Sequence, residues 1–167
     1  VEGSKKEIPP AQIRRMLETG DDAPDFTAET TQGDFTLSEA DSPVVLFFFP
    51  KAGSKVCTKE ACSFRDSMAE FNDLEATVVG ISPNDSLERL GEFAEKNSLD
   101  YPLISDKEGE IAELYDLSGL LGFSQKMKRV TYVVDDGKIV KSIGGLKELF
   151  SADEHVEGSL EAVKQYA

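Results

Sequence analysis

The sequence of 167 residues is poor in the residues that build metal sites and disulfide scaffolds: it has two cysteines and one histidine. Two cysteines are too few for a disulfide framework. His155 is distant in sequence from Cys57 and Cys62, and one Cys-x₄-Cys pair is not a convincing zinc ligand set. The spacing also differs from the Cys-x-x-Cys of disulfide reductases. We therefore expect no bound metal.

Basic residues are also scarce: the sequence has 18 Lys and Arg but 32 Asp and Glu, which gives a net charge of −14. Binding to DNA or RNA needs a basic surface, so we expect no nucleic-acid partner. The acidity fits either a high-salt habitat or an ordinary mildly acidic protein. The longest apolar run, 44–49, is far too short to span a membrane, so no membrane partner is expected.

The N-terminal stretch 1–15 is basic and irregular, and it lacks the apolar core of a signal peptide. We expect it to be an expression artefact or a flexible extension, with Met16 as the native start; a native targeting extension is the alternative. Residues 16–167 then form one domain. Few cysteines and no signal peptide predict a reducing, cytoplasmic location.

The domain alternates between strand and helix patterns. Expected strands are 26–29, 35–37, 44–49, 76–82, 101–105, 130–134 and 139–143, and expected helices are 54–71, 87–97, 110–115 and 159–166. The strand at 44–49 is apolar on both faces and belongs in the middle of a covered sheet. The Asp-Asp-Gly-Lys stretch at 135–138 predicts a hairpin. This order predicts an α/β, thioredoxin-like fold with a mixed central sheet and helices on both faces.

Cys57 lies where a helix is expected to start, just after the central strand. Sites in α/β sheets form at the carboxyl ends of such strands. Unpaired N–H groups and the helix dipole at that end stabilise a thiolate, as do the nearby Lys51, Lys55 and Lys59. Cys57 is therefore predicted to be a nucleophile, although a buried cysteine can also be only a small apolar residue.

The helix pattern also predicts how the two cysteines lie. An apolar stripe at helical spacing consists of Cys57, Ala61, Phe64, Met68 and Phe71. Cys62 is about 140° around the helix from Cys57, so the two Cα atoms would be roughly 8.6 Å apart. A disulfide needs less than about 7 Å. If these cysteines bond, the helix must unwind locally; otherwise Cys62 is only a buried residue.

This segment resembles the peroxiredoxins, and most closely the PrxQ or bacterioferritin comigratory protein subfamily. The signature Pro-x₃-Thr/Ser-x₂-Cys is matched by Pro50, Ser54 and Cys57. The stretches 58–66, 20–26 and 129–135 are also similar to the family, so the resemblance covers the chain from about Met16 onward. It implies a thiol peroxidase in which Cys57 becomes a sulfenic acid and Cys62 resolves it within the same chain.

The resemblance implies further site residues as well. Arg129 would supply a cation for the developing charge, Ser54 would donate its hydroxyl to the peroxide, and Pro50 would shield the thiolate. The simpler alternatives are a surface arginine, a helix cap and a strand terminator. Glu60 would orient Arg129, or would only favour the helix N-terminus by its charge.

Two departures from the family pattern stand near the site. Ser54-Lys55-Val56 replaces the usual Thr-Pro-Gly, which could change the stiffness of the loop and the ease of unwinding. Phe47 and Phe49 stand where the family often has Tyr, which could remove a hydrogen bond near the pocket. Neither departure removes a residue that the chemistry requires.

The resemblance also sets the expected partners. These are hydrogen peroxide or alkyl hydroperoxides and a thioredoxin-like dithiol reductant, with no cofactor, in a monomer or a weak dimer. Two alternatives remain open. One is a thioredoxin-fold redox sensor or binding module that uses the Cys57–Cys62 switch without efficient turnover. The other is a one-cysteine enzyme.

Overall fold

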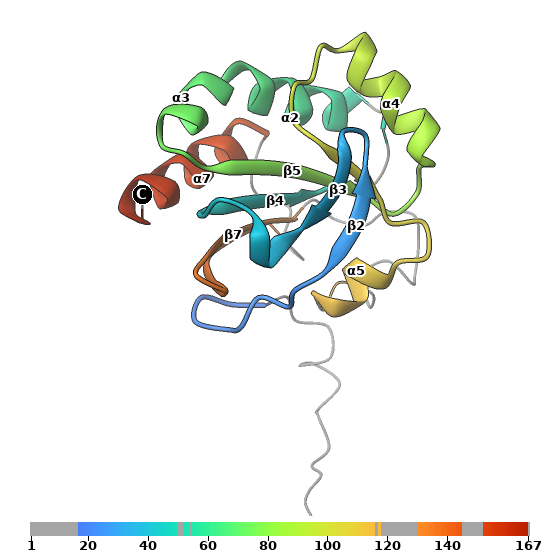
Figure 1. The fold of residues 1–167 in the computed structure, drawn as a ribbon. Helices are drawn as coiled ribbons and strands as arrows, with labels where there is room; N and C mark the ends of the chain where they lie inside the picture. Colours follow the sequence, from blue (N-terminus) through green and yellow to red (C-terminus); the bar gives the residue numbers. More distant parts are fainter. Residues whose placement is uncertain are drawn as a thin grey trace, which may run out of the picture.

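The computed structural model describes residues 17–166 except 50, 51, 54, 116, 118–129 and 145–151. These residues build a seven-stranded mixed sheet in the order β3-β2-β6-β5-β4-β7-β8 (Figure 1). The strands are β2 (Thr27–Thr30), β3 (Gly33–Thr36), β4 (Val44–Phe48), β5 (Thr77–Ser82), β6 (Leu103–Ser105), β7 (Val130–Asp135) and β8 (Lys138–Gly144). The N-terminal stretch 1–15 lies outside the described residues.

Helices cover both faces of this sheet, as predicted. One face carries α2 (Lys55–Asp66), α3 (Met68–Asp73), α4 (Leu87–Lys96) and α7 (Ala152–Tyr166). The other face carries the short helix η1 (Leu37–Glu39) and α5 (Glu110–Leu114) (Figure 1). The fold class predicted from the sequence, α/β with a thioredoxin-like layout, is confirmed.

Strand β4 occupies the predicted central position and separates two hydrophobic cores. It runs parallel to β5 and antiparallel to β7, and all five of its residues are buried. Successive side chains of a strand point to opposite faces. Val45 and Phe47 therefore pack under the α2–α7 layer, while Leu46 and Phe48 pack under η1 and α5. The unbroken apolar run is explained by burial on both faces.

Two predicted helices have different bounds in the structure. The helix expected over 54–71 is two helices, because the chain leaves helical geometry at Ser67 (φ −102, ψ 5) before α3 begins. Asp66 and Ser67 compete for backbone hydrogen bonds and favour such breaks. The C-terminal helix begins at Ala152 rather than at 159. The residues before 159 were not predicted to be helical because Gly158 disfavours a helix. In the structure a glycine is needed there, since a Cβ would lie 2.8 Å from Ile143 Cδ1.

The hairpin predicted at 135–138 is present. Asp136 (φ 53) and Gly137 (φ 78) form the turn between β7 and β8, as their sequence predicted. The strand expected over 35–37 is shifted toward the N-terminus: β3 already includes Gly33 and Asp34, and Leu37 starts η1 instead of ending a strand. These shifts are of one or two residues.

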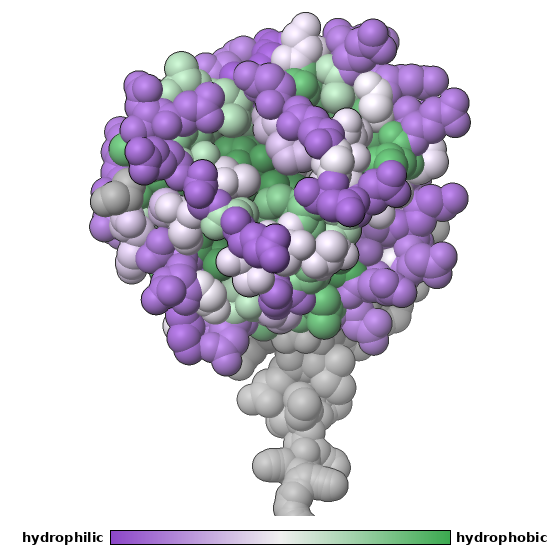
Figure 2. All heavy atoms as spheres, in the orientation of Figure 1, coloured by the Kyte–Doolittle hydropathy of each residue, from purple (hydrophilic) through white to green (hydrophobic). Residues whose placement is uncertain are grey.

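The surface shown in Figure 2 is covered mostly by hydrophilic residues, with hydrophobic residues visible between them near its centre. Within the part of the chain that the structure describes, no helix is long and apolar enough to cross a membrane.

Candidate active site

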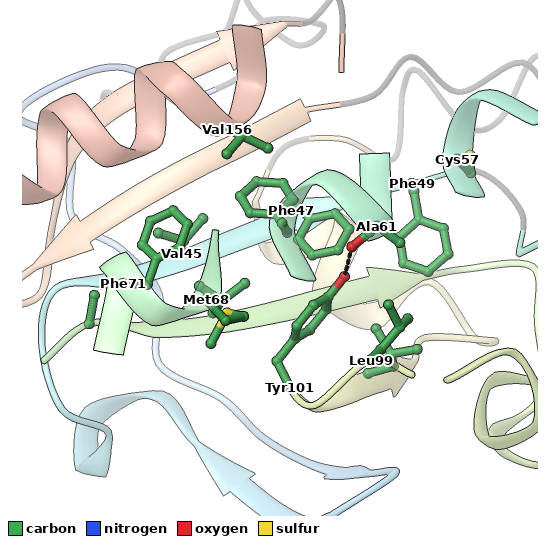
Figure 3. Packing of buried hydrophobic residues seen from close by; sticks show 14 of the residues in the cluster. Val45, Phe47, Phe49, Cys57, Ala61, Met68, Phe71, Leu99, Tyr101 and Val156 are labelled. Atoms are coloured by element: carbon green, nitrogen blue, oxygen red, sulfur yellow. Dashed lines mark hydrogen bonds between the residues drawn. The ribbon is translucent and has the colours of Figure 1, made fainter. Parts of the chain in front are cut away.

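Cys57 lies in the first turn of α2, as its third residue, directly after the central strand. Its side chain is 2% exposed and packs into the core beside Phe49 (Figure 3). The N–H groups and dipole of this helix end favour a thiolate there. Lys55 and Lys59 of the same helix are exposed to solvent. Cys57 and Cys62 are not joined in a disulfide. The predicted placement of Cys57 at the core-facing start of a helix is confirmed.

The loop between β4 and α2 is held by Asp85 and Arg89, two residues that no sequence motif indicated. The buried carboxylate of Asp85 accepts a hydrogen bond from Ala52 N–H at 2.7 Å and from Ser82 Oγ at 2.6 Å. Arg89 Nε binds the same carboxylate at 2.9 Å, and Arg89 Nη2 reaches Ala52 O at 3.4 Å. Both backbone polar groups of Ala52 are thus fixed by one ion pair, which positions the loop that leads to Cys57.

A buried polar cluster lies between α2, α7 and β7. Glu60 and His155 have fully buried side chains, and His155 Nδ1 lies 3.5 Å from Glu60 Oε2. Thr131 Oγ1 of β7 lies 2.8 Å from the same nitrogen. The cluster joins α2, α7 and β7 at a point one helical turn beyond Cys57. His155 lies before the helix expected over 159–166, so its pairing with α2 was not predicted from the sequence; α7 in fact begins at Ala152.

The part of α2 around Cys62 is anchored to the segment after α4. Tyr101 Oη donates to Ala61 O at 2.7 Å (Figure 3), and Arg65 Nη1 donates to Asn97 O at 2.7 Å. Cys62 Sγ lies 3.8 Å from Asn97 Oδ1 and is half-buried. The Cys62 thiol therefore faces the end of α4, whereas Cys57 faces the core. The two sulfurs have different neighbours in the reduced protein.

Burial raises the pKa of Tyr101 well above its usual value of 10.0, and the nearby charges of Glu60 and Cys62 raise it further. Tyr101 therefore stays protonated and remains a hydrogen-bond donor to Ala61 O over the physiological pH range.

Three predicted site residues, Pro50, Ser54 and Arg129, lie outside the described residues. The chain neighbour of Arg129, Val130, pairs with Phe48 at the end of β4. Of the predicted site residues, the structure places Cys57, Glu60 and Cys62 on α2. It adds Asp85, which follows the carboxyl end of β5; that position beside β4 is where α/β sheets gather site residues.

The fold and the site together define a class of protein. A thioredoxin-like sheet presents a buried thiol at a helix N-terminus, with a second thiol five residues later on the same helix. This arrangement suits thiol-based redox chemistry, in which a stabilised thiolate attacks an electrophile and a second thiol completes a disulfide.

Comparison with known proteins agrees with this class. The sequence profile of the AhpC/TSA family matches residues 19–143. A putative peroxiredoxin of Mycobacterium tuberculosis is 38% identical over 152 residues, which cover 89% of this chain and 97% of the relative. Peroxiredoxin Bcp of Bacillus subtilis is 35% identical over 156 residues, covering 89% of this chain and 96% of the relative.

A solved structure gives the same result. The crystal structure of peroxidoxin BcpB from M. tuberculosis superposes with a TM-score of 0.81 at 40% identity, covering 90% of this chain and 99% of that one. The chain belongs to the AhpC/TSA family. The resemblance to the Bcp/PrxQ peroxiredoxins is confirmed, and with it the assignment as a thiol peroxidase.

Proposed function

We propose that Cys57 is the peroxidatic residue of this enzyme. The observation that carries the proposal is its position in the first turn of α2, 2% exposed at the end of the central strand. The Cys57 thiolate attacks one oxygen of the peroxide, and the O–O bond breaks. Sulfur keeps the attacked oxygen as a sulfenic acid. The other oxygen leaves as hydroxide or alkoxide and takes up a proton to become water or an alcohol.

Cys62 then attacks the Cys57 sulfenic acid, forming a disulfide and releasing water. The helical separation of roughly 8.6 Å between the Cα atoms exceeds the reach of a disulfide, so α2 must unwind between the two residues. The different neighbours of the two sulfurs support this step: Cys62 lies against Asn97 and Cys57 against Phe49. The reduced and the disulfide forms therefore differ in the structure of α2.

The substrates are hydrogen peroxide and organic hydroperoxides, and an external thioredoxin-like dithiol reduces the disulfide. Membership in the peroxiredoxin family supports both classes. Pro50, Ser54 and Arg129 shield the thiolate, donate to the peroxide and offset its developing charge, and Glu60 supports Arg129. These roles are carried over from the family motif. A cytoplasmic location and a monomeric or weakly dimeric state remain predictions.

A coupled assay tests the proposal. The protein is mixed with thioredoxin, thioredoxin reductase, NADPH and hydrogen peroxide, and NADPH consumption is followed. Wild-type protein is expected to turn over many equivalents, Cys57→Ser none, and Cys62→Ser only the first stoichiometric oxidation. Full turnover by Cys57→Ser would refute the mechanism. Oxidation of the wild type that stops after one equivalent would identify a redox sensor instead.

A further inference from the structure

Two fully buried ionisable side chains meet behind the catalytic helix, although they lie far apart in the sequence. Glu60 is on α2, between Cys57 and Cys62, and His155 is near the start of α7. His155 Nδ1 lies 3.5 Å from Glu60 Oε2, and both side chains are 0% exposed. Thr131 Oγ1, 2.8 Å from the same nitrogen, fixes the orientation of the imidazole ring. Thr131 and the surrounding core therefore hold the imidazole of His155 beside the carboxyl group of Glu60.

The contact lies inside the packing of α7 on α2. Val156 and Val163 of α7 are buried in the same hydrophobic cluster as Ala61 and Phe64 of α2. A carboxylate within such a cluster needs polar partners. His155 is an ionic partner of Glu60 when its imidazole is protonated, and removing one partner of a buried pair is costly. His155 thus supplies one of the contacts that Glu60 makes when α2 is helical.

We propose that His155 is a positioning residue that, through Glu60, holds α2 in the helical form in which Cys57 reacts with peroxide. This inference rests on the proposed Cys57–Cys62 disulfide. Residues 58–61 connect the two cysteines, so the unwinding that joins the sulfurs must move Glu60. The contact with His155 breaks in that step, and α7 thereby opposes disulfide formation.

The consequence is that the two chemical steps respond in opposite directions to the loss of His155. Oxidation of Cys57 needs the intact first turn of α2, so it becomes slower when that turn is less populated. Disulfide formation needs the unwound helix, so it becomes faster. A side chain with a merely structural role would not separate the two rates in this way.

The experiment measures both rates by rapid quench and intact-mass spectrometry. Sulfenic acid formation is followed in Cys62→Ser protein, and disulfide formation is followed in protein with both cysteines after one equivalent of hydrogen peroxide. The test variant is His155→Leu, which keeps much of the volume. His155→Asn places a neutral donor near the position of Nδ1. Val163→Ala is the matched control, since it removes buried apolar volume from the same helix about 12 Å along its axis from His155.

In His155→Leu we expect disulfide formation to be about tenfold faster and sulfenic acid formation slower, because one partner of a buried carboxylate is lost. His155→Asn should restore part of both rates, and Val163→Ala should leave their ratio unchanged. Unchanged rates in His155→Leu, or an equal shift in Val163→Ala, would overturn the inference. If the wild type forms no disulfide, the proposed mechanism itself fails.

If His155→Leu does not fold, hydrogen exchange on reduced His155→Asn decides. Exchange at the amides of 57–62 should be faster than in Val163→Ala, while that of β4 stays unchanged. Equal protection of 57–62 in the two variants would overturn the inference.

Discussion

The hydroxyl of Tyr101 donates a 2.7 Å hydrogen bond to the carbonyl oxygen of Ala61, the residue that directly precedes Cys62. This buried bond ties the middle of α2 to the segment that leads into β6. It has to break if residues 58–61 leave the helix. Together with the contact between Glu60 and His155, it anchors α2 on two sides, so the helix resists the rearrangement that the proposed disulfide requires.

Removing this hydroxyl with Tyr101→Phe should lower the free energy of unfolding by about 1 kcal/mol. The same loss favours the unwound form of α2, so disulfide formation after peroxide addition should be about fivefold faster. Urea denaturation and rapid-quench mass spectrometry measure the two effects.

Tyr115→Phe is the control for Tyr101→Phe. Tyr115 Oη makes a 2.7 Å bond to Pro24 O in the other core, away from α2. Tyr115→Phe should lower the free energy of unfolding by about as much as Tyr101→Phe does, without changing the rate of disulfide formation. Slower disulfide formation in Tyr101→Phe would contradict the account.

The ion pair of Asp85 and Arg89 should matter for the first chemical step, because it fixes both polar backbone groups of Ala52. Asp85→Asn removes the negative charge and replaces one acceptor oxygen by an NH₂ group, which cannot accept the hydrogen bonds that the carboxylate now receives. In the Cys62→Ser background, the rate constant for oxidation by peroxide should fall about tenfold, since small misplacements in a site are costly. Stopped-flow competition or rapid quench measures this constant.

Ser86→Ala provides the control for Asp85→Asn. Ser86 Oγ caps α4 by accepting from Arg89 N at 3.1 Å, whereas the side chains of Asp85 and Arg89 hold Ala52. The substitution should cost about 1 kcal/mol of stability and leave the peroxide rate constant unchanged. If Ser86→Ala slowed oxidation as much as Asp85→Asn does, the effect of Asp85 would be one of general stability.

Gly80 should tolerate no side chain, because β5 passes directly under Phe47. A Cβ there would lie 2.7 Å from Leu103 Cδ2 and 2.8 Å from Phe47 Cζ. Phe47 is itself stacked on Phe64 of α2, with ring centroids 4.5 Å apart, so it has little room to move. Gly80→Ala should lower the free energy of unfolding by about 1–3 kcal/mol, measured by urea denaturation.

Gly91→Ala gives the opposite expectation in the same measurement. The helical position in α4 has open space around a Cβ, so alanine should raise stability by about 0.5–1 kcal/mol. A stabilising Gly80→Ala, or a destabilising Gly91→Ala, would contradict this description of the packing.

Asp106 should make the stability depend on pH. Burial raises the pKa of its carboxyl above the usual 3.8, although hydrogen bonds from the N–H groups of Ile111 and Ala112 oppose the shift. The folded protein then binds this proton more tightly than the unfolded chain. Between the unfolded and folded pKa values, the contribution of Asp106 to stability therefore falls as the pH rises.

Asp106→Asn removes this titration. The free energy of unfolding of the wild type should fall relative to that of Asp106→Asn as the pH rises from 3.8. Urea denaturation at a series of pH values measures the difference. A relative gain by the wild type over this range would contradict the expected direction.

The central sheet could be predicted from sequence because its signals are local. The unbroken apolar run of β4 and the Asp136–Gly137 turn each determine their own conformation. Cys57 could be placed for the same reason, from a strand end followed by a helix start. The break at Ser67 and the early start of α7 depend on packing between distant segments, such as Gly158 against Ile143, and local preference predicts them poorly.

The supporting residues of the site were missed because each acts across the fold. Asp85 holds Ala52, which is 33 residues earlier in the chain, and Tyr101 holds Ala61, 40 residues earlier. His155 meets Glu60 only because α7 packs on α2. A sequence shows which residues could ionise or donate, but the pairing of these partners follows from the topology of the sheet.

In the proposed mechanism, peroxide oxidises Cys57 and Cys62 then closes a disulfide within the same chain. The most direct test is intact-mass spectrometry after one equivalent of hydrogen peroxide. We expect loss of two hydrogen atoms in the wild type, gain of one oxygen atom in Cys62→Ser, and no change in Cys57→Ser. Oxygen gain in Cys57→Ser at the rate of Cys62→Ser, or a wild type that stays at the sulfenic acid, would contradict the proposed mechanism.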